Sequence, residues 1–244
     1  SQSIATGAVR NALVIGAETM SRVVDWSDRG TCVLFGDGAG AVVLKGSSIP
    51  GGVMATTLRS DGSGADLLSL PALYHNPVPI AGAEFAHNGH HKNIVEMDGR
   101  QVYRFATNVI ASSVQDVLKQ SGLTLDDIAL IIPHQANVRI IETAARKMKL
   151  PLEKFYLNLD HTGNTSAASI PVALCDAVSE GRLEPDDNII FVGFGGGLTW
   201  GASLVKWDVT PPQVSFIDHE WKRARYVMAR GRSRLRRLSR RVEA

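Results

Sequence analysis

The chain has 244 residues, 44% of them hydrophobic and 20% charged, which is an ordinary composition for a globular protein. No run of eighteen apolar residues occurs, and the first residues lack the basic and apolar segments of a signal peptide. We therefore expect neither a membrane-spanning helix nor a secretory leader. The net charge of +2 is uneven, because residues 209–244 hold ten Lys or Arg against three Asp or Glu, whereas residues 1–208 carry an acidic excess.

Short runs rich in Val and Ile alternate with stretches of helical periodicity, which indicates an α/β fold. In residues 101–121, for example, apolar side chains recur mostly three or four positions apart, as on one face of a helix. In chain order, the expected strands are residues 12–16, 33–35, 41–44, 128–133, 155–158, 188–192 and 201–205, and the expected helices are residues 101–121, 135–149 and 166–180.

Two segments of the chain share a pattern of strand, glycine-rich turn and strand. The first begins at Asn11 and the second at Asn188, about 177 residues later, a distance that fits a duplicated half-domain. Because the chain opens on a strand pattern without an initiator Met, we expect it to be incomplete. Residues 1–51 are then the end of a first half, residues 52–208 a complete second half, and residues 209–244 a disordered basic tail. Attachment of that tail to nucleic acid or another polyanion is the alternative.

Residues 59–99 form a long stretch without clear periodicity, as in many functional loops. Nothing near its histidines completes a ligand set of the usual spacing, so we predict no metal site. The two cysteines, Cys32 and Cys175, lie in apolar runs without CxxC spacing, and we interpret both as small buried hydrophobes in a reducing cytoplasm. The histidines of the stretch are His75, His87, His90 and His91.

Three polar or glycine-rich turns each follow an expected strand: Pro-His-Gln-Ala-Asn at 133–137, Gly-Asn-Thr-Ser-Ala-Ala-Ser at 163–169 and Gly-Phe-Gly-Gly-Gly at 193–197. Loops at the carboxyl ends of strands carry the sites of α/β sheets, so the three turns can converge. His134 supplies a hydrogen-bond donor or general base and Asn164 an uncharged amide donor, while Gly196 lets a backbone N–H approach an oxyanion.

Each of these turns alone has a purely structural interpretation: a hydrogen-bonding histidine before a helix, a Ser/Thr helix cap, and a tight turn. Together, at spacings of 30 and 32 residues from His134 to Asn164 to Gly196, they favour a catalytic site.

These motifs closely resemble the β-ketoacyl-acyl-carrier-protein synthase III family. The resemblance covers residues 1–207 and includes Asp-Arg-Gly-Thr at 28–31, Phe-Gly-Asp-Gly-Ala-Gly at 35–40, Ser-Asp-Gly at 60–62 and Phe-Gly-Gly-Gly-Leu-Thr-Trp-Gly at 194–201. Plant-type polyketide synthases usually carry Pro in their last motif, where this chain has Gly196, which favours the bacterial type. The resemblance implies a thiolase-like fold with a mixed sheet and covering helices.

The resemblance also implies an acyltransferase that starts fatty acid synthesis. In that family a cysteine accepts an acyl group, usually acetyl from acetyl-CoA; malonyl-acyl carrier protein then loses CO₂, and its carbanion attacks the acyl thioester to give a 3-oxoacyl-acyl carrier protein. His134 and Asn164 are expected to hold the malonyl thioester oxygen, and the Gly196 N–H to contribute to a second oxyanion hole. The family's Ala-Cys-Ser/Ala-Gly sequence is absent, so we expect this chain to lack the nucleophile and to retain at most malonyl decarboxylation.

The same matching implies partners. Acyl-CoA and malonyl-acyl carrier protein are expected as substrates, with no cofactor, in a cytoplasmic protein that forms a homodimer when complete and binds neither membrane nor nucleic acid. The alternatives are a secondary-metabolite condensing enzyme of the same fold and a non-catalytic subunit that only binds carrier protein. The segment matched to carrier-protein binding is Gln135, Ala136, Asn137, Val138 and Arg139, with Arg104, Arg146 and Lys147 as further basic contacts, and the positions matched to CoA are Arg29 and Gly99.

Overall fold

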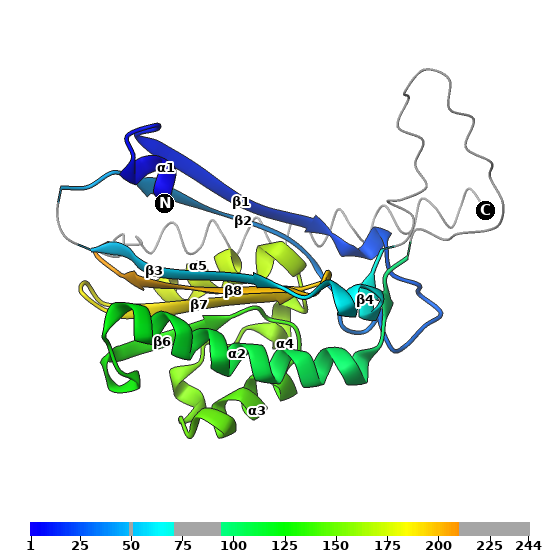
Figure 1. Cartoon of the computed structure of the whole chain (residues 1–244). Helices are drawn as coiled ribbons and strands as arrows, with labels where there is room; N and C mark the ends of the chain where they lie inside the picture. Colours follow the sequence, from blue (N-terminus) through cyan, green and yellow to red (C-terminus); the bar gives the residue numbers. More distant parts are fainter. Residues whose placement is uncertain (49–50, 71–93, 210–244) are drawn as a thin grey trace, which may run out of the picture. The chain divides into compact units, whose positions relative to one another are not determined.

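The computed structural model describes residues 1–48, 51–70 and 94–209, which fall in one compact unit, Ser1–Val209 (Figure 1). The expected basic tail and the four histidines His75, His87, His90 and His91 lie outside the described residues. Among the described residues, no helix is long and apolar enough to cross a membrane. The short elements are α1 (Gln2–Ala5), η1 (Met20–Arg22), η2 (Gly62–Leu67), β4 (Leu68–Ser69), β5 (Glu96–Met97), η4 (Leu125–Asp127), η5 (Leu152–Lys154), α4 (Leu159–Thr162) and η6 (Ser166–Ala168).

The centre of the fold is a four-stranded mixed sheet in the order β3-β8-β7-β6. β6 runs parallel to β7, whereas β8 is antiparallel to both of its neighbours. β6 and β7 are buried on both faces of the sheet, which is why they read as continuous apolar runs. The strands are β3 (Gly52–Ser60), β6 (Ile128–Pro133), β7 (Asn188–Gly195) and β8 (Thr199–Lys206).

Helices cover both faces of this sheet. α2 (Gly99–Ser121) and α3 (Val138–Met148) pack on one face with Ile131 and Ile190, and α5 (Ser169–Ser179) packs on the other with Ile132 and Ile189. Neighbouring strand residues thus point to opposite cores, as the two-residue period of a strand requires. In Figure 1, α2 and α3 lie below the sheet.

Cap residues set the ends of the long helix. The Asp98 side chain accepts hydrogen bonds from the first N–H groups of α2, and the helix ends at Gly122, whose φ of 75° is the left-handed conformation that glycine adopts easily.

β1 (Asn11–Thr19) and β2 (Asp37–Lys45) form a separate antiparallel pair that packs on η6 and α5. The approach is close: a Cβ on Gly40 would lie 2.9 Å from Cβ of Pro171 in α5, so only glycine fits there. The opposite face of the pair is apolar and open, with Leu13, Ile15 and Val43 each more than 60% exposed.

The α/β class and the mixed sheet with covering helices confirm the prediction from sequence. Two expected strands were wrong, and one expected helix, residues 166–180, begins three residues later than predicted. Residues 33–35 form a turn that ends in a single bridge at Phe35, and residues 155–158 contribute only a bridge from Phe155 to Ile131. Residues 166–168 form a 3-10 turn before α5, so that helix begins at Ser169.

Candidate active site

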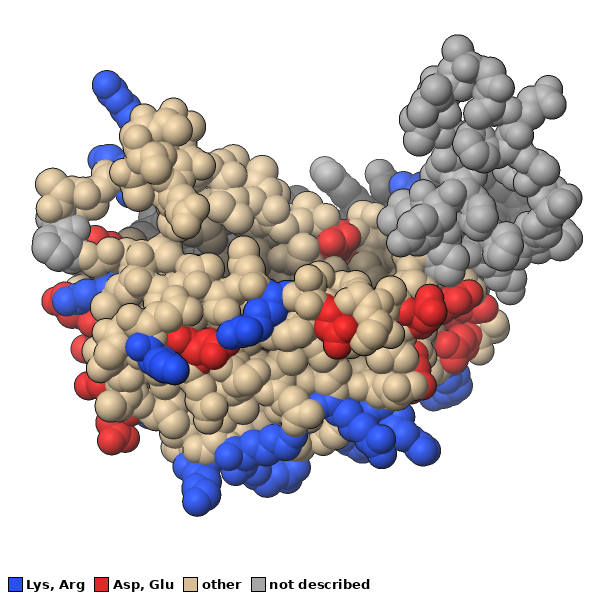
Figure 2. Space-filling model, viewed as in Figure 1, with Lys and Arg blue, Asp and Glu red and all other residues tan. Residues whose placement is uncertain are grey.

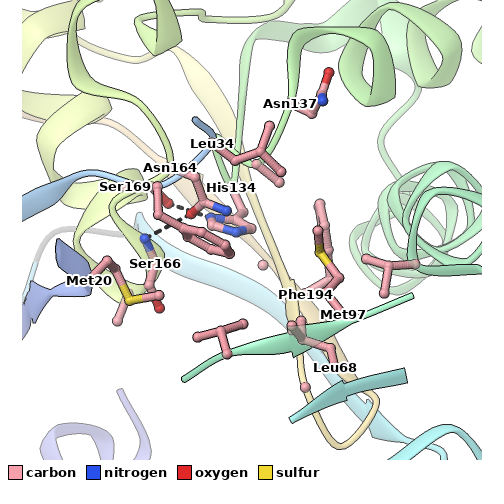
Figure 3. A pocket seen from close by; sticks show the side chains of 18 of the residues that line it. Met20, Leu34, Leu68, Met97, His134, Asn137, Asn164, Ser166, Ser169 and Phe194 are labelled. Carbon is pink, nitrogen blue, oxygen red and sulfur yellow. Dashed lines mark hydrogen bonds between the residues drawn. The ribbon is translucent and has the colours of Figure 1, made fainter. Parts of the chain in front are cut away.

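One cavity of about 1080 Å³ lies where the three site turns meet (Figure 3). His134 after β6, Asn164 before η6 and Gly196 after β7 all line it. His134 and Gly196 come together because the adjacent strands β6 and β7 end at the same edge of the sheet, whereas Asn164 reaches the cavity from the loop between α4 and η6.

His134 is held in one orientation by three neighbours. Its backbone N–H donates to the backbone carbonyl of Val192 at 2.7 Å, which extends the pairing of β6 with β7. Its Nδ1 lies 2.6 Å from Oγ of Ser169, and the Phe194 ring meets the imidazole edge to face at a centroid distance of 5.1 Å. The other ring nitrogen, Nε2, has no hydrogen-bond partner within the described part of the chain.

Burial of the imidazole lowers the pKa of His134 to about 4. At neutral pH the ring is therefore uncharged and carries a single proton. Such a ring donates one hydrogen bond without placing a full positive charge in the pocket.

Asn164 is held through its backbone by a neighbouring loop and through its side chain by its own turn. Its backbone N–H donates to the Leu34 carbonyl at 2.9 Å, and its backbone carbonyl accepts from the Gly36 N–H at 2.8 Å. Its Oδ1 accepts from the Ser166 N–H at 2.9 Å. Because the oxygen of the amide is occupied, the NH₂ group is the end left for a ligand, and Figure 3 shows Asn164 beside His134.

Gly196 belongs to the turn between β7 and β8. A Cβ at this position would lie 2.7 Å from the Leu68 carbonyl oxygen, so a side chain would push the turn away from β4. Its N–H has no hydrogen-bond partner among the residues described and remains available to a ligand.

Of the other predicted site residues, Gly99, Ala136 and Asn137 line the cavity, whereas Arg29 does not. Val138 and Arg139 point to the surface of α3 and stay candidates for a partner contact.

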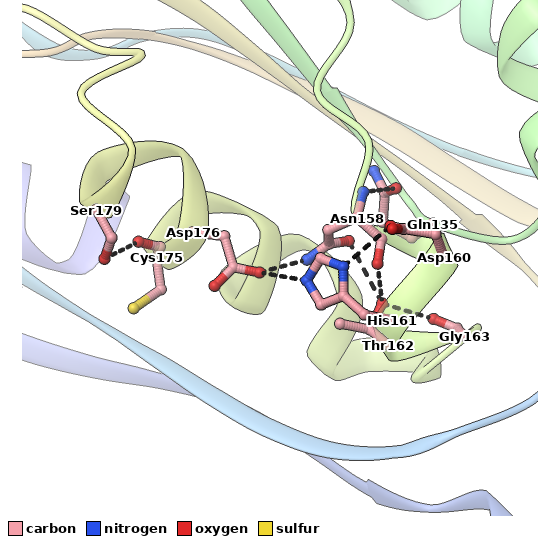
Figure 4. Close-up of polar contacts among 9 residues, drawn as sticks. All are labelled: Gln135, Asn158, Asp160, His161, Thr162, Gly163, Cys175, Asp176 and Ser179. Atoms are coloured by element: carbon pink, nitrogen blue, oxygen red, sulfur yellow. Dashed lines mark hydrogen bonds and ion pairs between the residues drawn. The ribbon is translucent and has the colours of Figure 1, made fainter. Parts of the chain in front are cut away.

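The prediction that Gln135 belongs to the carrier-protein contact does not hold for its side chain, which is fully buried. Its Nε2 donates to the carbonyls of Pro133 at 2.8 Å and Tyr156 at 3.0 Å, and its Oε1 accepts from the Asn158 N–H at 3.2 Å. Figure 4 shows this residue beside Asn158, whose amide in turn donates to Asp176 of α5 at 2.8 Å. Gln135 therefore joins the loop after β6 to its neighbours and does not present its side chain to a partner.

Ser169 and Phe194 were not predicted as site residues, although both stand inside the motifs at 163–169 and 193–197. Cys175 was expected to be buried but is exposed, and Cys32 is partly exposed. Neither cysteine lines the cavity. Much of the remaining wall is apolar, including Met20, Leu34, Leu68 and Met97.

The lowered pKa of His134 predicts how stability depends on pH. The unfolded chain protonates this histidine near its ordinary value of 6.5 and the folded chain only near 4, so the unfolded state binds more protons between these values. Stability from this group is complete above pH 6.5 and is lost as the pH falls toward 4. Between pH 7 and pH 4, wild type should lose about 3 kcal/mol more unfolding free energy than His134→Gln in urea titrations. If the unfolding free energies of the two proteins changed with pH in parallel, the lowered pKa of His134 would be contradicted.

The mixed sheet, the covering helices and the site at the strand ends define a thiolase-like protein, a class shared by the similar solved structures. A 3-oxoacyl-[acyl-carrier-protein] synthase III of Aquifex aeolicus matches with a TM-score of 0.74 and 41% identity over 84% of this chain. The corresponding structure from Pseudomonas aeruginosa matches with a TM-score of 0.76 and 36% identity over 86% of this chain. A priming β-ketosynthase of the R1128 polyketide pathway matches with a TM-score of 0.73 and 31% identity over 86% of this chain.

Sequence comparisons identify the family. Residues 1–62 match the model of 3-oxoacyl-[acyl-carrier-protein (ACP)] synthase III, and residues 118–207 match the model of its C-terminal region. A β-ketoacyl-[acyl-carrier-protein] synthase III of Clostridium perfringens is 48% identical over 203 residues. The chain belongs to the β-ketoacyl-acyl-carrier-protein synthase III family, which confirms the expectation from its motifs.

The match covers 83% of this chain but 61% of the Clostridium perfringens relative. The aligned solved structures give the same picture, with 61% of the Aquifex aeolicus chain and 62% of the Pseudomonas aeruginosa chain covered. This chain therefore spans about three-fifths of the length of its relatives.

Proposed function

We propose that this chain carries the malonyl-activating half of a decarboxylating condensation that starts fatty acid synthesis. The observation that carries the proposal is the meeting of a neutral His134 and an oriented Asn164 amide in one cavity, beside the free N–H of Gly196. Two uncharged side-chain donors that meet in one cavity fit a developing thioester enolate better than a ground-state carbonyl, and the Gly196 N–H is left for the oxyanion of the following step.

The chemistry follows from these donors. Malonyl thioester loses CO₂ when the bond between its carboxylate and C2 breaks, and the electron pair moves into the thioester as an enolate. His134 and Asn164 donate hydrogen bonds to the enolate oxygen, and each such donor contributes roughly 3–4 kcal/mol to the step. In the second step, C2 of the enolate attacks the carbonyl carbon of an acyl thioester and forms the new carbon–carbon bond. The Gly196 N–H stabilises the oxyanion of this step, which then collapses and expels a thiolate.

Acyl transfer needs a thiolate in the cavity, and neither Cys32 nor Cys175 lines it. We infer that this chain by itself decarboxylates malonyl thioester slowly and does not accept an acyl group from acyl-CoA. Acyl-CoA, with acetyl-CoA as the preferred primer, belongs to the complete reaction, and Arg29 and Gly99 stay the proposed contacts for its CoA. No cofactor takes part in this scheme.

The proposed carrier-protein surface is the exposed side of α3. Figure 2 shows Lys and Arg side chains along the lower edge of the view, where α3 lies. Arg139 is exposed and has no ion-pair partner within the described residues, whereas Arg146 and Lys147 donate to side chains of α3 and α2. A free guanidinium on α3, next to Asn137 and Ile140 that line the cavity, is suited to an acidic carrier helix.

The assembly and location of the protein are part of the same proposal. A homodimer is supported by the open apolar face of β1 and β2, since exposed patches of this kind mark interaction surfaces. A cytoplasmic location is supported by two cysteines that form no disulfide.

The test is CO₂ release from malonyl-acyl carrier protein, followed by mass spectrometry of the acetyl-carrier product. The purified chain should convert the substrate, and His134→Ala should slow conversion about 10²- to 10³-fold while leaving the unfolding transition cooperative. A chain that binds carrier protein without ever releasing CO₂ would instead support a non-catalytic binding subunit.

The likeness to the R1128 priming β-ketosynthase favours a secondary-metabolite condensing enzyme as the second candidate. A chimera in which the Clostridium perfringens relative supplies the amino-terminal segment separates the two. Competition among acyl-CoA primers should favour acetyl-CoA for the first function, and preference for a longer acyl group would favour the second.

A further inference from the structure

Ser169 is a buried polar residue at the first position of α5, with 2% of its surface exposed. Its Oγ lies 2.6 Å from Nδ1 of His134, which is the far side of the imidazole from the free Nε2. Figure 3 shows the two side chains joined by this hydrogen bond, with Asn164 next to them. The hydroxyl thus contacts the ring that the proposed mechanism uses, from a helix 35 residues further along the chain.

The direction of this hydrogen bond follows from counting donors and acceptors. If Nδ1–H donated to Ser169, the serine O–H would need another acceptor, and no other partner of this Oγ occurs within the described residues. A buried hydroxyl left without an acceptor is unfavourable. The arrangement that satisfies both groups has the serine O–H donating to an unprotonated Nδ1.

We propose that Ser169 is a positioning residue that fixes the tautomer of His134, so that the single proton of the neutral ring sits on Nε2 and points into the cavity. The tautomer assignment depends on the geometry of the two side chains and a neutral ring, not on the proposed function. Its catalytic use rests on the proposed function, because a proton on Nε2 makes His134 a donor to the thioester oxygen and not a base.

The same geometry argues against Ser169 as a nucleophile. A nucleophilic serine gives its proton to a histidine while its oxygen reaches the substrate, but Ser169 is only 2% exposed and its oxygen is held 2.6 Å from Nδ1 of the ring.

The test is the protonation pattern of the histidine ring, read by two-bond ¹H–¹⁵N correlation NMR on the full chain with ¹⁵N-labelled histidine at pH 7. The His134 signals are identified by their loss in His134→Gln. We expect a protonated Nε2 and an unprotonated Nδ1 in wild type, retained in Ser169→Thr and replaced by a mixture of tautomers in Ser169→Ala. A protonated Nδ1 in wild type, or an unchanged pattern in Ser169→Ala, overturns the proposal. If Ser169→Ala does not fold, the wild-type spectrum alone decides.

Kinetics then separate this proposal from the proposed function. Ser169→Ala should lower kcat for malonyl decarboxylation about tenfold with little change in KM, and Ser169→Thr should restore it. If the wild-type chain has no decarboxylase activity, the proposed function is refuted, and the NMR spectrum still decides the tautomer of His134. An active Ser169→Ala with wild-type kcat, or covalent labelling of Ser169 by a fluorophosphonate, overturns the positioning role.

Discussion

Replacing Asn164 by Ala should slow release of CO₂ from malonyl-acyl carrier protein by about 10²- to 10³-fold. The reason is the orientation of the amide: Oδ1 accepts from the Ser166 N–H at 2.9 Å, so the NH₂ group is the donor that faces the developing enolate. The loss should appear in kcat more than in KM, because the interaction strengthens only as charge develops on the oxygen. Steady-state assays of acetyl-carrier formation measure both.

Asn164→Asp is the matched control for this prediction. A carboxylate keeps an oxygen for the Ser166 N–H and nearly the same shape, so the unfolding midpoint should stay close to that of wild type. It has no N–H to offer, and its negative charge repels an enolate, so the activity should fall at least as far as in Asn164→Ala. Activity within about tenfold of wild type in Asn164→Asp would show that the amide is not the donor.

A double substitution of His134 and Asn164 adds one further expectation. Two donors that hold a single oxygen act as a unit, so the combined loss should be smaller than the product of the single losses. Multiplicative losses would place the two side chains on different steps or different oxygens.

The strands that carry the site were predictable because their local signals were strong. The expected strand 128–133 agrees with β6, and the expected helix 101–121 differs from α2 by two residues. A continuous apolar run, a capping Asp98 and a terminal Gly122 each act over a few residues, so they are visible in sequence. The turns at 133–137 and 193–197 follow from the same signals, since each comes at the end of an apolar strand, whereas the turn at 163–169 follows the short helix α4 and not the strand expected there.

The features that were not predicted from the sequence depend on contacts between residues that are distant along the chain. β3 was not predicted because its residues alternate weakly and its partner β8 lies about 140 to 150 residues further along the chain. Ser169 was named in a motif, but only the packing of α5 brings its hydroxyl to His134. The sequence therefore indicated which motifs lie at the cavity, whereas the contact of Ser169 with His134 follows only from tertiary packing.

The role of Gln135 depends on contacts that are not visible in the sequence. A glutamine between His134 and Asn137 in a polar turn is typical of an exposed contact residue, yet this side chain is fully enclosed. It satisfies three backbone groups: the carbonyls of Pro133 and Tyr156 and the N–H of Asn158. These groups have no access to water, so an unsatisfied donor or acceptor among them costs about 1–3 kcal/mol.

Gln135→Ala should therefore lower the unfolding free energy by on the order of 4 kcal/mol, measured by urea denaturation, because it leaves three buried backbone groups unsatisfied and a small cavity. Arg139→Ala is the control from the same segment: its exposed guanidinium has no partner in the described structure, so stability should be unchanged. Carrier-protein affinity should instead fall in Arg139→Ala, and the difference from wild type should shrink as salt is raised. A Gln135→Ala protein of wild-type stability with weakened carrier binding would restore Gln135 to the partner surface and contradict the structural role.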